Sequence, residues 1–273
     1  MGTTTYAKAD GLPKQYKQHQ RSFLGLMLVL SCAFLITLLP DVNLTLFRLL
    51  NGIAAELPDW PLLLITDLGN GVTLGVITLC FLIKCPEIIL RVIIASVLSL
   101  LLVPLLKQYF DMPRPAAVLE PLNIIGETRM SHSFPSGHTA SAFLFAGTLW
   151  FAYQSHTIKV FAITFGTIVG ISRIIVGAHW PQDIMLGAIV GLLCAYTAAY
   201  CPPTQLQRVN NALMLMFLWL VLVICELEKS FDKDIIWQVL LLRWGLLFTA
   251  ATLFLRQYNI KQLLIQRFAS KTQ

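Results

Sequence analysis

The sequence predicts an all-α integral membrane protein with about eight transmembrane helices. Of its 273 residues, 56% are hydrophobic and only 12% are charged, whereas soluble domains carry about 25% charged residues. Apolar stretches close to the ~20 residues that cross a bilayer recur along almost the whole chain. They leave no room for a separate soluble domain.

The apolar stretches follow a polar leader at residues 1–22. They lie near residues 23–40, 61–83, 87–106, 137–154, 158–177, 182–200, 211–227 and 235–255. The stretch between the first two, "DVNLTLFRLLNGIAAELPDW", is too polar to cross a membrane. Its apolar residues nevertheless recur at helical spacing: Val42, Leu46, Leu49, Leu50 and Ile53. We expect this stretch to lie flat on the outer membrane interface.

The charged residues between the spans predict the topology. Lys and Arg gather in the leader and in the tail, which carries Arg256, Lys261, Arg267 and Lys271. Because Lys and Arg favour cytoplasmic loops, both termini are predicted to be cytoplasmic. The loops at 107–136 and 177–182 then lie outside. The net charge of +6 is explained by these anchors, and no nucleic-acid partner is predicted.

The six cysteines fall within or at the ends of apolar runs and show no CxxC spacing, so we interpret them as small buried apolar residues. The segment "VLSC" at 29–32 resembles a lipoprotein cleavage box. However, the apolar run continues beyond it, which favours an uncleaved first helix.

Three polar clusters interrupt this apolar chain, where polar groups are costly and therefore informative. They are "KQYFDMPRP" at 107–115, "SFPSGHTAS" at 133–141 and "ISRIIVGAHWPQD" at 171–183. The predicted topology places all three on the outer face of the membrane.

The three clusters carry the residue types that bind a phosphoryl group. Lys107, Arg114 and Arg173 supply fixed cations, and the two arginines can bind in a bidentate manner. Ser136 is a good helix N-cap, and Gly137 leaves the backbone bare. The free amides of the helix that begins there can therefore point at an anion.

The same clusters offer a nucleophile and a proton donor. Pro181 suits the first turn of a helix, which would bring His179 and Asp183 together. Asp183 can hold one ring nitrogen of His179 and leave the other free to attack phosphorus. His138 is the second histidine. A metal shared by His179 and Asp183 is the alternative, but no third ligand is apparent and the nearby cations would repel it.

Together these residues resemble the three-part signature of the type 2 phosphatidic acid phosphatase (PAP2) family, also called lipid phosphate phosphatases. The resemblance implies a six-helix catalytic membrane domain at 23–201, with 202–273 adding two C-terminal helices and a basic cytoplasmic tail. It implies that His179 is the nucleophile that forms a phosphohistidine, that Asp183 orients it, and that His138 is the general acid. Residues Lys107, Arg114, Ser136, Gly137 and Arg173 would hold the phosphate. Neither metal nor cofactor would be needed.

The resemblance predicts an enzyme of the bacterial inner membrane that hydrolyses a lipid phosphate or diphosphate at the periplasmic face. Undecaprenyl diphosphate, phosphatidylglycerophosphate, phosphatidate and lipid A all remain candidate substrates. Phosphotransfer to a sugar hydroxyl is an alternative within the same chemistry. Two other classes are a lipid scramblase or transporter, which would not need the His179 and Asp183 pair, and a vanadium haloperoxidase, whose known relatives are soluble. The sequence leaves the oligomeric state open.

Three further polar residues stand outside the signature. For Asp67, in the second span, we favour a hydrogen bond to another helix over substrate contact. Arg243, in the last span, is expected to meet a partner within the bundle. His132 is expected to be an exposed loop residue, with contact to the substrate headgroup as the alternative.

Overall fold

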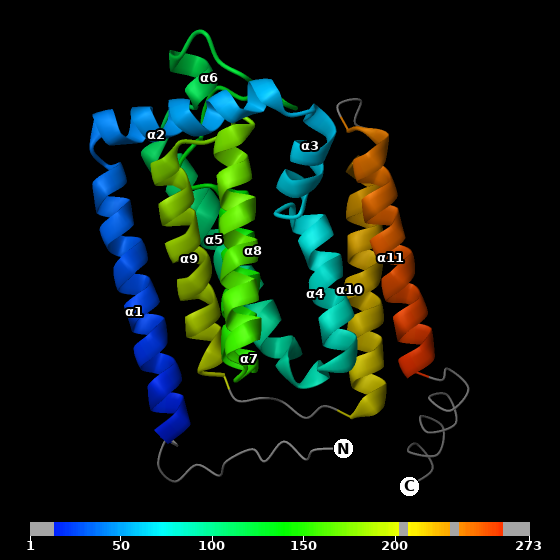
Figure 1. Cartoon of the computed structure of the whole chain (residues 1–273). Helices are drawn as coiled ribbons and strands as arrows, with labels where there is room; N and C mark the ends of the chain where they lie inside the picture. The colour runs from blue at the N-terminus through cyan, green and yellow to red at the C-terminus, as the bar shows by residue number, and fades with distance from the viewer. Residues whose placement is uncertain (1–13, 202–206, 230–234, 259–273) are drawn as a thin grey trace, which may run out of the picture.

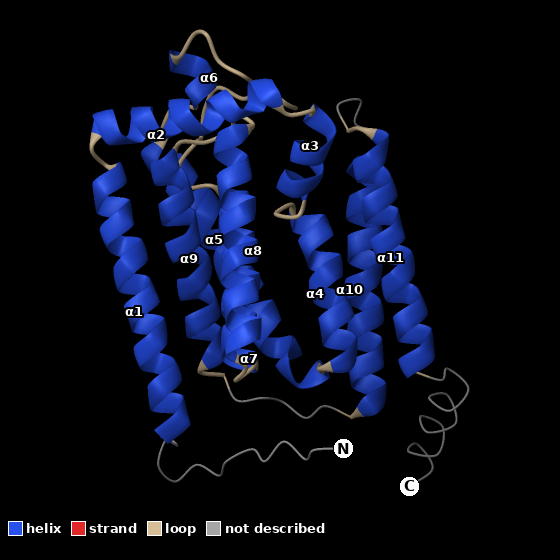
Figure 2. Ribbon diagram, viewed as in Figure 1, coloured by secondary structure: helices blue, strands red, loops and turns tan. Residues whose placement is uncertain are grey.

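The computed structural model describes residues 14–201, 207–229 and 235–258, and this part of the chain is helical without strands (Figure 2). Most of the predicted polar leader, the predicted domain boundary at 202 and the basic tail residues Lys261, Arg267 and Lys271 lie outside the described residues.

The long helices run side by side as a bundle (Figure 1). They are α1 (Lys14–Thr37), α4 (Gly71–Lys84), α5 (Ile89–Phe110), α7 (Gly137–Ala152), α8 (His156–Ile175), α9 (Pro181–Ala199), α10 (Arg208–Lys229) and α11 (Trp237–Gln257). The shorter elements are α2 (Pro40–Gly52), α3 (Asp59–Asp67), α6 (Pro115–Val118) and the 3-10 turns Ile53–Glu56 and Pro86–Ile88. Helix α1 begins well before the predicted start at 23.

Within the described residues, six helices are long and apolar enough to cross a membrane, and α3 with α4 can make a seventh span. The one predicted span that is not among these is 137–154, which corresponds to α7, a helix of only 16 residues. Large apolar side chains such as Leu28, Leu100 and Phe248 lie exposed on the outside of the bundle. An exposed apolar surface of this kind is what a lipid environment stabilises.

The predicted second span, 61–83, is not one continuous helix. Helices α3 and α4 are bent by 56° at a short break. Asn70 caps the start of α4, because its side-chain oxygen accepts a hydrogen bond from the N–H of Val72 at 2.9 Å. The break therefore forms where "GNG" (69–71) interrupts the apolar run, a turn signal within the predicted span.

Helix α2 lies across the ends of the long helices, on the side where α6 is found (Figure 1). It corresponds to the stretch predicted to lie flat. The side chains that it buries are Phe47 and Asn51, whereas Leu49, on the predicted apolar face, is exposed. The Asn51 amide nitrogen donates to the carbonyls of Asn123 at 2.7 Å and Ile175 at 2.9 Å. The helix is thus tied to the loop and to the end of α8 beneath it.

Helices α7 and α9 pack backbone against backbone. A Cβ atom placed on Gly191 would lie 2.2 Å from the carbonyl oxygen of Ala140, and one on Gly187 would lie 2.7 Å from that of Ser136. Small residues four apart permit this close approach between membrane helices. At the end of the seam, the N–H of Ser136 donates to the carbonyl of Asp183 at 3.0 Å. The contact therefore fixes the start of α7 against the start of α9.

Helices α10 and α11 pack on α4 through a separate apolar cluster. Its buried members include Val76 and Leu79 from α4, Leu215 from α10 and Leu247 from α11. The last two helices thus contact the bundle on the side of the bent pair (Figure 1).

Candidate active site

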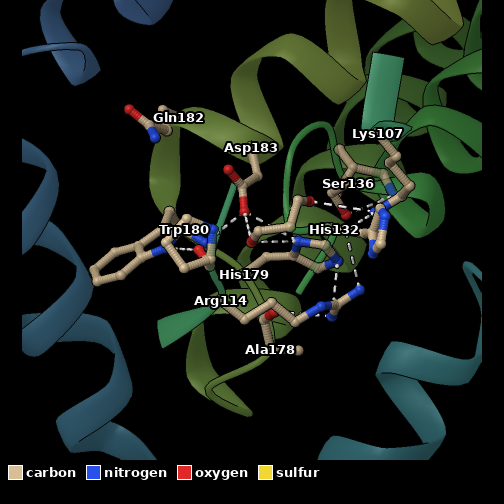
Figure 3. Close-up of polar contacts among 12 residues, drawn as sticks. Lys107, Arg114, His132, Ser136, Ala178, His179, Trp180, Gln182 and Asp183 are labelled. Atoms are coloured by element: carbon tan, nitrogen blue, oxygen red, sulfur yellow. Dashed lines mark hydrogen bonds and ion pairs between the residues drawn. The ribbon is translucent and has the colours of Figure 1, made fainter. Parts of the chain in front are cut away.

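The three polar clusters of the sequence meet at one end of the bundle. Lys107 comes from the last turn of α5, Ser136 precedes α7, and His179 lies between α8 and α9. Figure 3 shows these side chains with Arg114 and Asp183 in one group joined by polar contacts. The structure thus brings the three clusters together at one end of the bundle, as the predicted topology required.

A tight turn between α8 and α9 positions His179. Gly177 has φ +75°, and a Cβ atom there would lie 2.5 Å from the carbonyl oxygen of Asn123, so only glycine fits this position. The turn directs the N–H groups of Ala178 and His179 to the carbonyl of Arg173, at 3.1 and 3.2 Å. Helix α9 then begins at Pro181, the residue predicted to open it.

His179 and Asp183 form a buried pair across this first turn. The Nδ1 atom of His179 lies 3.1 Å from Oδ2 of Asp183, and the two side chains are 2% and 0% exposed. The same carboxylate oxygen accepts the backbone N–H of Trp180 at 3.0 Å. Because a carboxylate only accepts, Nδ1 of His179 carries the hydrogen and Nε2 keeps its lone pair.

Ser133 completes this pair, a role that the sequence reasoning missed. Its hydroxyl donates to Oδ2 of Asp183 and lies 3.5 Å from Nδ1 of His179. The side chain is fully buried. Ser133 was visible as the first residue of the second cluster, but its contact with Asp183 joins residues 50 positions apart.

The environment of His179 favours the neutral imidazole. Burial lowers its pKa well below the usual value, and the cations Arg114, Arg173 and Lys107 lower it further. A neutral ring with a lone pair on Nε2 is the form that can attack an electrophile.

Arg114 and Lys107 belong to the same group of side chains (Figure 3). The Nη1 atom of Arg114 lies 3.5 Å from Nε2 of His179 and donates to the carbonyl of Ala178 at 3.1 Å. Lys107 Nζ donates to the carbonyls of His132 and Ser133, at 2.5 and 3.3 Å. The Nε atom of Arg114 also donates to the carbonyl of Ser131 at 2.9 Å, so both cations bind the loop that leads into the second cluster, and Arg114 lies beside the nucleophile.

Arg173 is held from another direction. Its Nη1 donates to the hydroxyl of Thr66, on α3, at 2.8 Å. Its Nε is buried and has no hydrogen-bond partner among the described residues. A buried donor without a partner is costly, and an anion at this place would supply one.

The start of α7 has the features of an anion site. The Ser136 side chain accepts the hydroxyl hydrogen of Thr139 at 3.0 Å and caps the helix. The first-turn N–H groups have no intrahelical acceptor. A Cβ on Gly137 would meet only Val103, at an ordinary 3.8 Å, so protein atoms do not fill the space in front of this residue.

His138, the predicted general acid, lies on the first turn of α7 and is half-buried. Its ring makes no hydrogen bond with a described residue. A Cβ on Gly69 would lie 3.0 Å from both Cβ and the carbonyl oxygen of His138. The break between α3 and α4 therefore packs directly on this residue.

The remaining polar residues behave differently. His132 is exposed, as expected, and its Nε2 lies 3.5 Å from Asp111. It reaches the site through its carbonyl rather than its ring. Asp67 and Arg243 form a buried ion pair at 2.6 Å, which confirms the interhelix contacts expected for both. Among the described residues, no group of three His, Cys, Asp or Glu side chains is arranged to hold a metal ion.

Comparison with known proteins assigns the family. Residues 88–207 match the PAP2 superfamily. The bacitracin transport permease protein BcrC of Bacillus licheniformis is 30% identical over 146 residues, which cover 54% of this chain and 70% of that protein. The chain belongs to the PAP2 superfamily. The family predicted from the three clusters is confirmed, and residues 107–183, which hold every predicted site residue, lie within the match.

Other PAP2 proteins similar to this chain are named as phosphatases. A lipid A 1-phosphatase of Porphyromonas gingivalis is 42% identical over 65 residues, which span only 15% of its length and 23% of this chain. An undecaprenyl-diphosphatase of Sulfolobus acidocaldarius is 24% identical over 151 residues, which cover 55% of this chain and 73% of that protein. The predicted enzyme class, a PAP2-type phosphatase, agrees with these names.

The crystal structure of Aquifex aeolicus LpxE matches this PAP2 chain with a TM-score of 0.53 and 35% identity. The match covers 96% of that chain but 59% of this one. The PAP2 match ends at residue 207, before α10 and α11 begin. The last two helices thus lie outside the family match.

Proposed function

We propose that this protein hydrolyses a lipid phosphate or diphosphate through a phosphohistidine on His179. The observation that carries the proposal is the buried pair of His179 and Asp183, with the lone pair of Nε2 on the side of Arg114. A purely anion-binding site would need the cations but no buried carboxylate behind a histidine.

In the first step, Nε2 of His179 attacks phosphorus and the bond from phosphorus to the lipid oxygen breaks. His138 donates a proton to the leaving oxygen. Asp183 holds the hydrogen on Nδ1 and stabilises the positive charge that the ring gains. Arg114, Arg173, Lys107 and the amides at the start of α7 bind the phosphoryl oxygens, where negative charge is spread during transfer.

In the second step, a water molecule attacks the same phosphorus atom while His138 accepts its proton. The bond between phosphorus and Nε2 breaks, and its electron pair returns to the ring. Inorganic phosphate leaves, and His179 is again neutral. The fixed cations supply the charge stabilisation that a metal ion supplies in other phosphatases, so the proposed reaction is independent of metal.

The proposed substrate is an anionic head on an apolar tail that enters from the bilayer. Similar proteins are named for lipid A and for undecaprenyl diphosphate. The residues proposed to bind substrate here contact only a phosphate, so both classes are proposed, together with phosphatidylglycerophosphate and phosphatidate. We further propose eight crossings, cytoplasmic termini, a catalytic domain at 23–201 and a site that faces the periplasm.

A phosphate-release assay on the full-length protein in detergent tests the proposal. It uses a panel of these four lipid phosphates with EDTA present. We expect release by the wild type, loss of release in His179→Ala and a strong decrease in His138→Ala. His156→Ala is the matched control, because His156 is exposed at the start of α8, away from the site. Release from none of the lipids by the wild type would overturn the proposal, and loss caused by EDTA alone would overturn metal independence.

A further inference from the structure

A buried ion-pair network joins the last two helices to the break between α3 and α4. Arg243, on α11, donates through Nε and Nη2 to the two carboxylate oxygens of Asp67, at 3.1 and 2.6 Å. Its Nη1 donates to Glu226, on α10, at 3.2 Å. The exposed fractions of Asp67, Arg243 and Glu226 are 6%, 4% and 0%. Charges buried in a membrane bundle are costly unless paired, so these three side chains constrain one another.

Asp67 connects this network to both sides of the break. It is the last residue of α3. Its Oδ2 accepts the hydroxyl hydrogen of Thr73, on α4, at 2.6 Å, and its carbonyl accepts the N–H of Asn70 at 2.8 Å. The carboxylate thus spans the bend of 56° between the helices. Arg243 fixes the carboxylate through a bidentate contact, the geometry in which arginine is most directional.

The break in turn contacts two residues of the proposed site. Thr66, adjacent to Asp67, accepts the hydrogen bond from Nη1 of Arg173. Gly69 packs on His138 with no room for a methyl group. A shift of the break would therefore move the partner of a phosphate-binding arginine and the support of the general acid.

Arg243 also holds the carboxylate that follows Thr66, the residue that binds Arg173. While Arg243 occupies both oxygens of Asp67, Arg173 remains bound to the neutral Thr66 and keeps its Nε available. Without Arg243, Asp67 would be an uncompensated buried anion beside Arg173, and it would compete with phosphate for that cation.

We propose that α10 and α11 act as positioning elements for phosphate binding, with Arg243, oriented by Glu226, holding Asp67 so that Thr66 presents Arg173 to the phosphate. Arg243, Asp67 and Thr66 are positioning residues in this scheme. The inference rests on the proposed function, because it takes Arg173 as a phosphate ligand. It assigns a role to the two helices that lie outside the PAP2 match.

The test measures phosphate binding in the full-length protein in two ways. One is the inhibition constant of inorganic phosphate against lipid phosphate hydrolysis. The other is the increase in melting temperature that inorganic phosphate causes, which needs no turnover. We expect Arg243→Met to raise the inhibition constant about ten-fold, the value of one charge-assisted hydrogen bond, and to reduce the thermal shift. Arg243→Lys keeps the positive charge but loses the bidentate contact, so its inhibition constant should lie between those of the wild type and Arg243→Met.

Two comparisons separate positioning from a general loss of packing. Trp219→Phe removes the hydrogen bond from α10 to the carbonyl of Leu247 on α11, at 3.1 Å, and should leave the inhibition constant within about two-fold. In an Arg173→Met background, adding Arg243→Met should change phosphate binding less than about two-fold, because the supported contact is already absent. Equal effects of Arg243→Met in both backgrounds would overturn the proposal, as would a wild-type constant in Arg243→Met.

Thr66→Val provides a second route if Arg243→Met does not fold. It removes only the hydroxyl that holds Arg173, and it should weaken phosphate binding by a similar factor. An unchanged constant in Thr66→Val would overturn the inference. If the wild type releases phosphate from no lipid, the proposed function fails, but the thermal shift still tests positioning. A wild type that inorganic phosphate does not stabilise would overturn the positioning scheme itself.

Discussion

Replacing Asp183 by asparagine isolates the charge of the buried carboxylate from its hydrogen bonds. All the donors found for Asp183 converge on Oδ2: the hydroxyl of Ser133, the N–H of Trp180 and Nδ1 of His179. Oδ1 is buried without a partner among the described residues. The amide oxygen of an asparagine can therefore take the position of Oδ2 and keep these contacts, with its NH₂ group at the unused position. The substitution removes the charge and leaves the shape.

The expected loss follows from the distance between the charges. When the ring is phosphorylated it gains positive charge, and Nδ1 lies 3.1 Å from the carboxylate oxygen. Because both charges are delocalised, an effective separation of about 4 Å and an effective dielectric constant of about 20 give an attraction of about 4 kcal/mol. A barrier raised by this amount slows the first chemical step about 10³-fold.

The assay is the single-turnover rate of phosphate release from a lipid phosphate, with melting temperatures measured in parallel. We expect Asp183→Asn to lose about 10³-fold in rate and to keep a higher melting temperature than Asp183→Ala. Asp183→Ala should lose as much rate and also stability, because buried donors are left unpaired. Asp41→Asn, at an exposed acid on α2, is the control. A decrease of less than about ten-fold in Asp183→Asn would refute the role given to the carboxylate charge.

Two further predictions concern the pH dependence and the helix seam. The neutral form of His179 is the nucleophile, so activity falls as the pH drops through its lowered pKa. Lys107 is one cation that lowers this pKa, so Lys107→Met should raise it and move the acid limb of the kcat/KM profile to higher pH; a move to lower pH would contradict this sign. Gly191→Ala should reduce the free energy of unfolding by about 1–3 kcal/mol, and so lower the melting temperature, because its methyl group would lie 2.2 Å from the carbonyl oxygen of Ala140. Gly25→Ala should leave the melting temperature unchanged, because a Cβ there meets nothing within 4 Å. Equal melting temperatures for the two variants would contradict the close packing of α7 on α9.

The sequence predicted the parts of the site that are local in the chain. His179 and Asp183 share one helical turn, and Pro181 marks its start, so their contact follows from helix geometry. The cations could be assigned to one face because apolar spans and loop charges predict topology. The family followed from the same three clusters.

The sequence could not identify partners that only the packing of distant helices brings together. Arg173 and Thr66 are 107 positions apart, and Arg243 and Asp67 are 176 apart. Nothing in the spacing of these residues distinguishes one buried polar partner from another. The break at 68–70 is a different case, because "GNG" gave a local signal that the surrounding apolar run outweighed. The roles of the predicted site residues stay predictions until the variants are measured.

The seam between α7 and α9 determines how the site tolerates change. Gly187 and Gly191 bring the two main chains into contact. At the end of that contact, the N–H of Ser136 donates a hydrogen bond to the carbonyl of Asp183. The separation between the anion-binding helix start and the nucleophile is therefore set by backbone atoms, not by side-chain rotamers. A side-chain substitution elsewhere in the site can therefore change the contacts of one part without changing this separation.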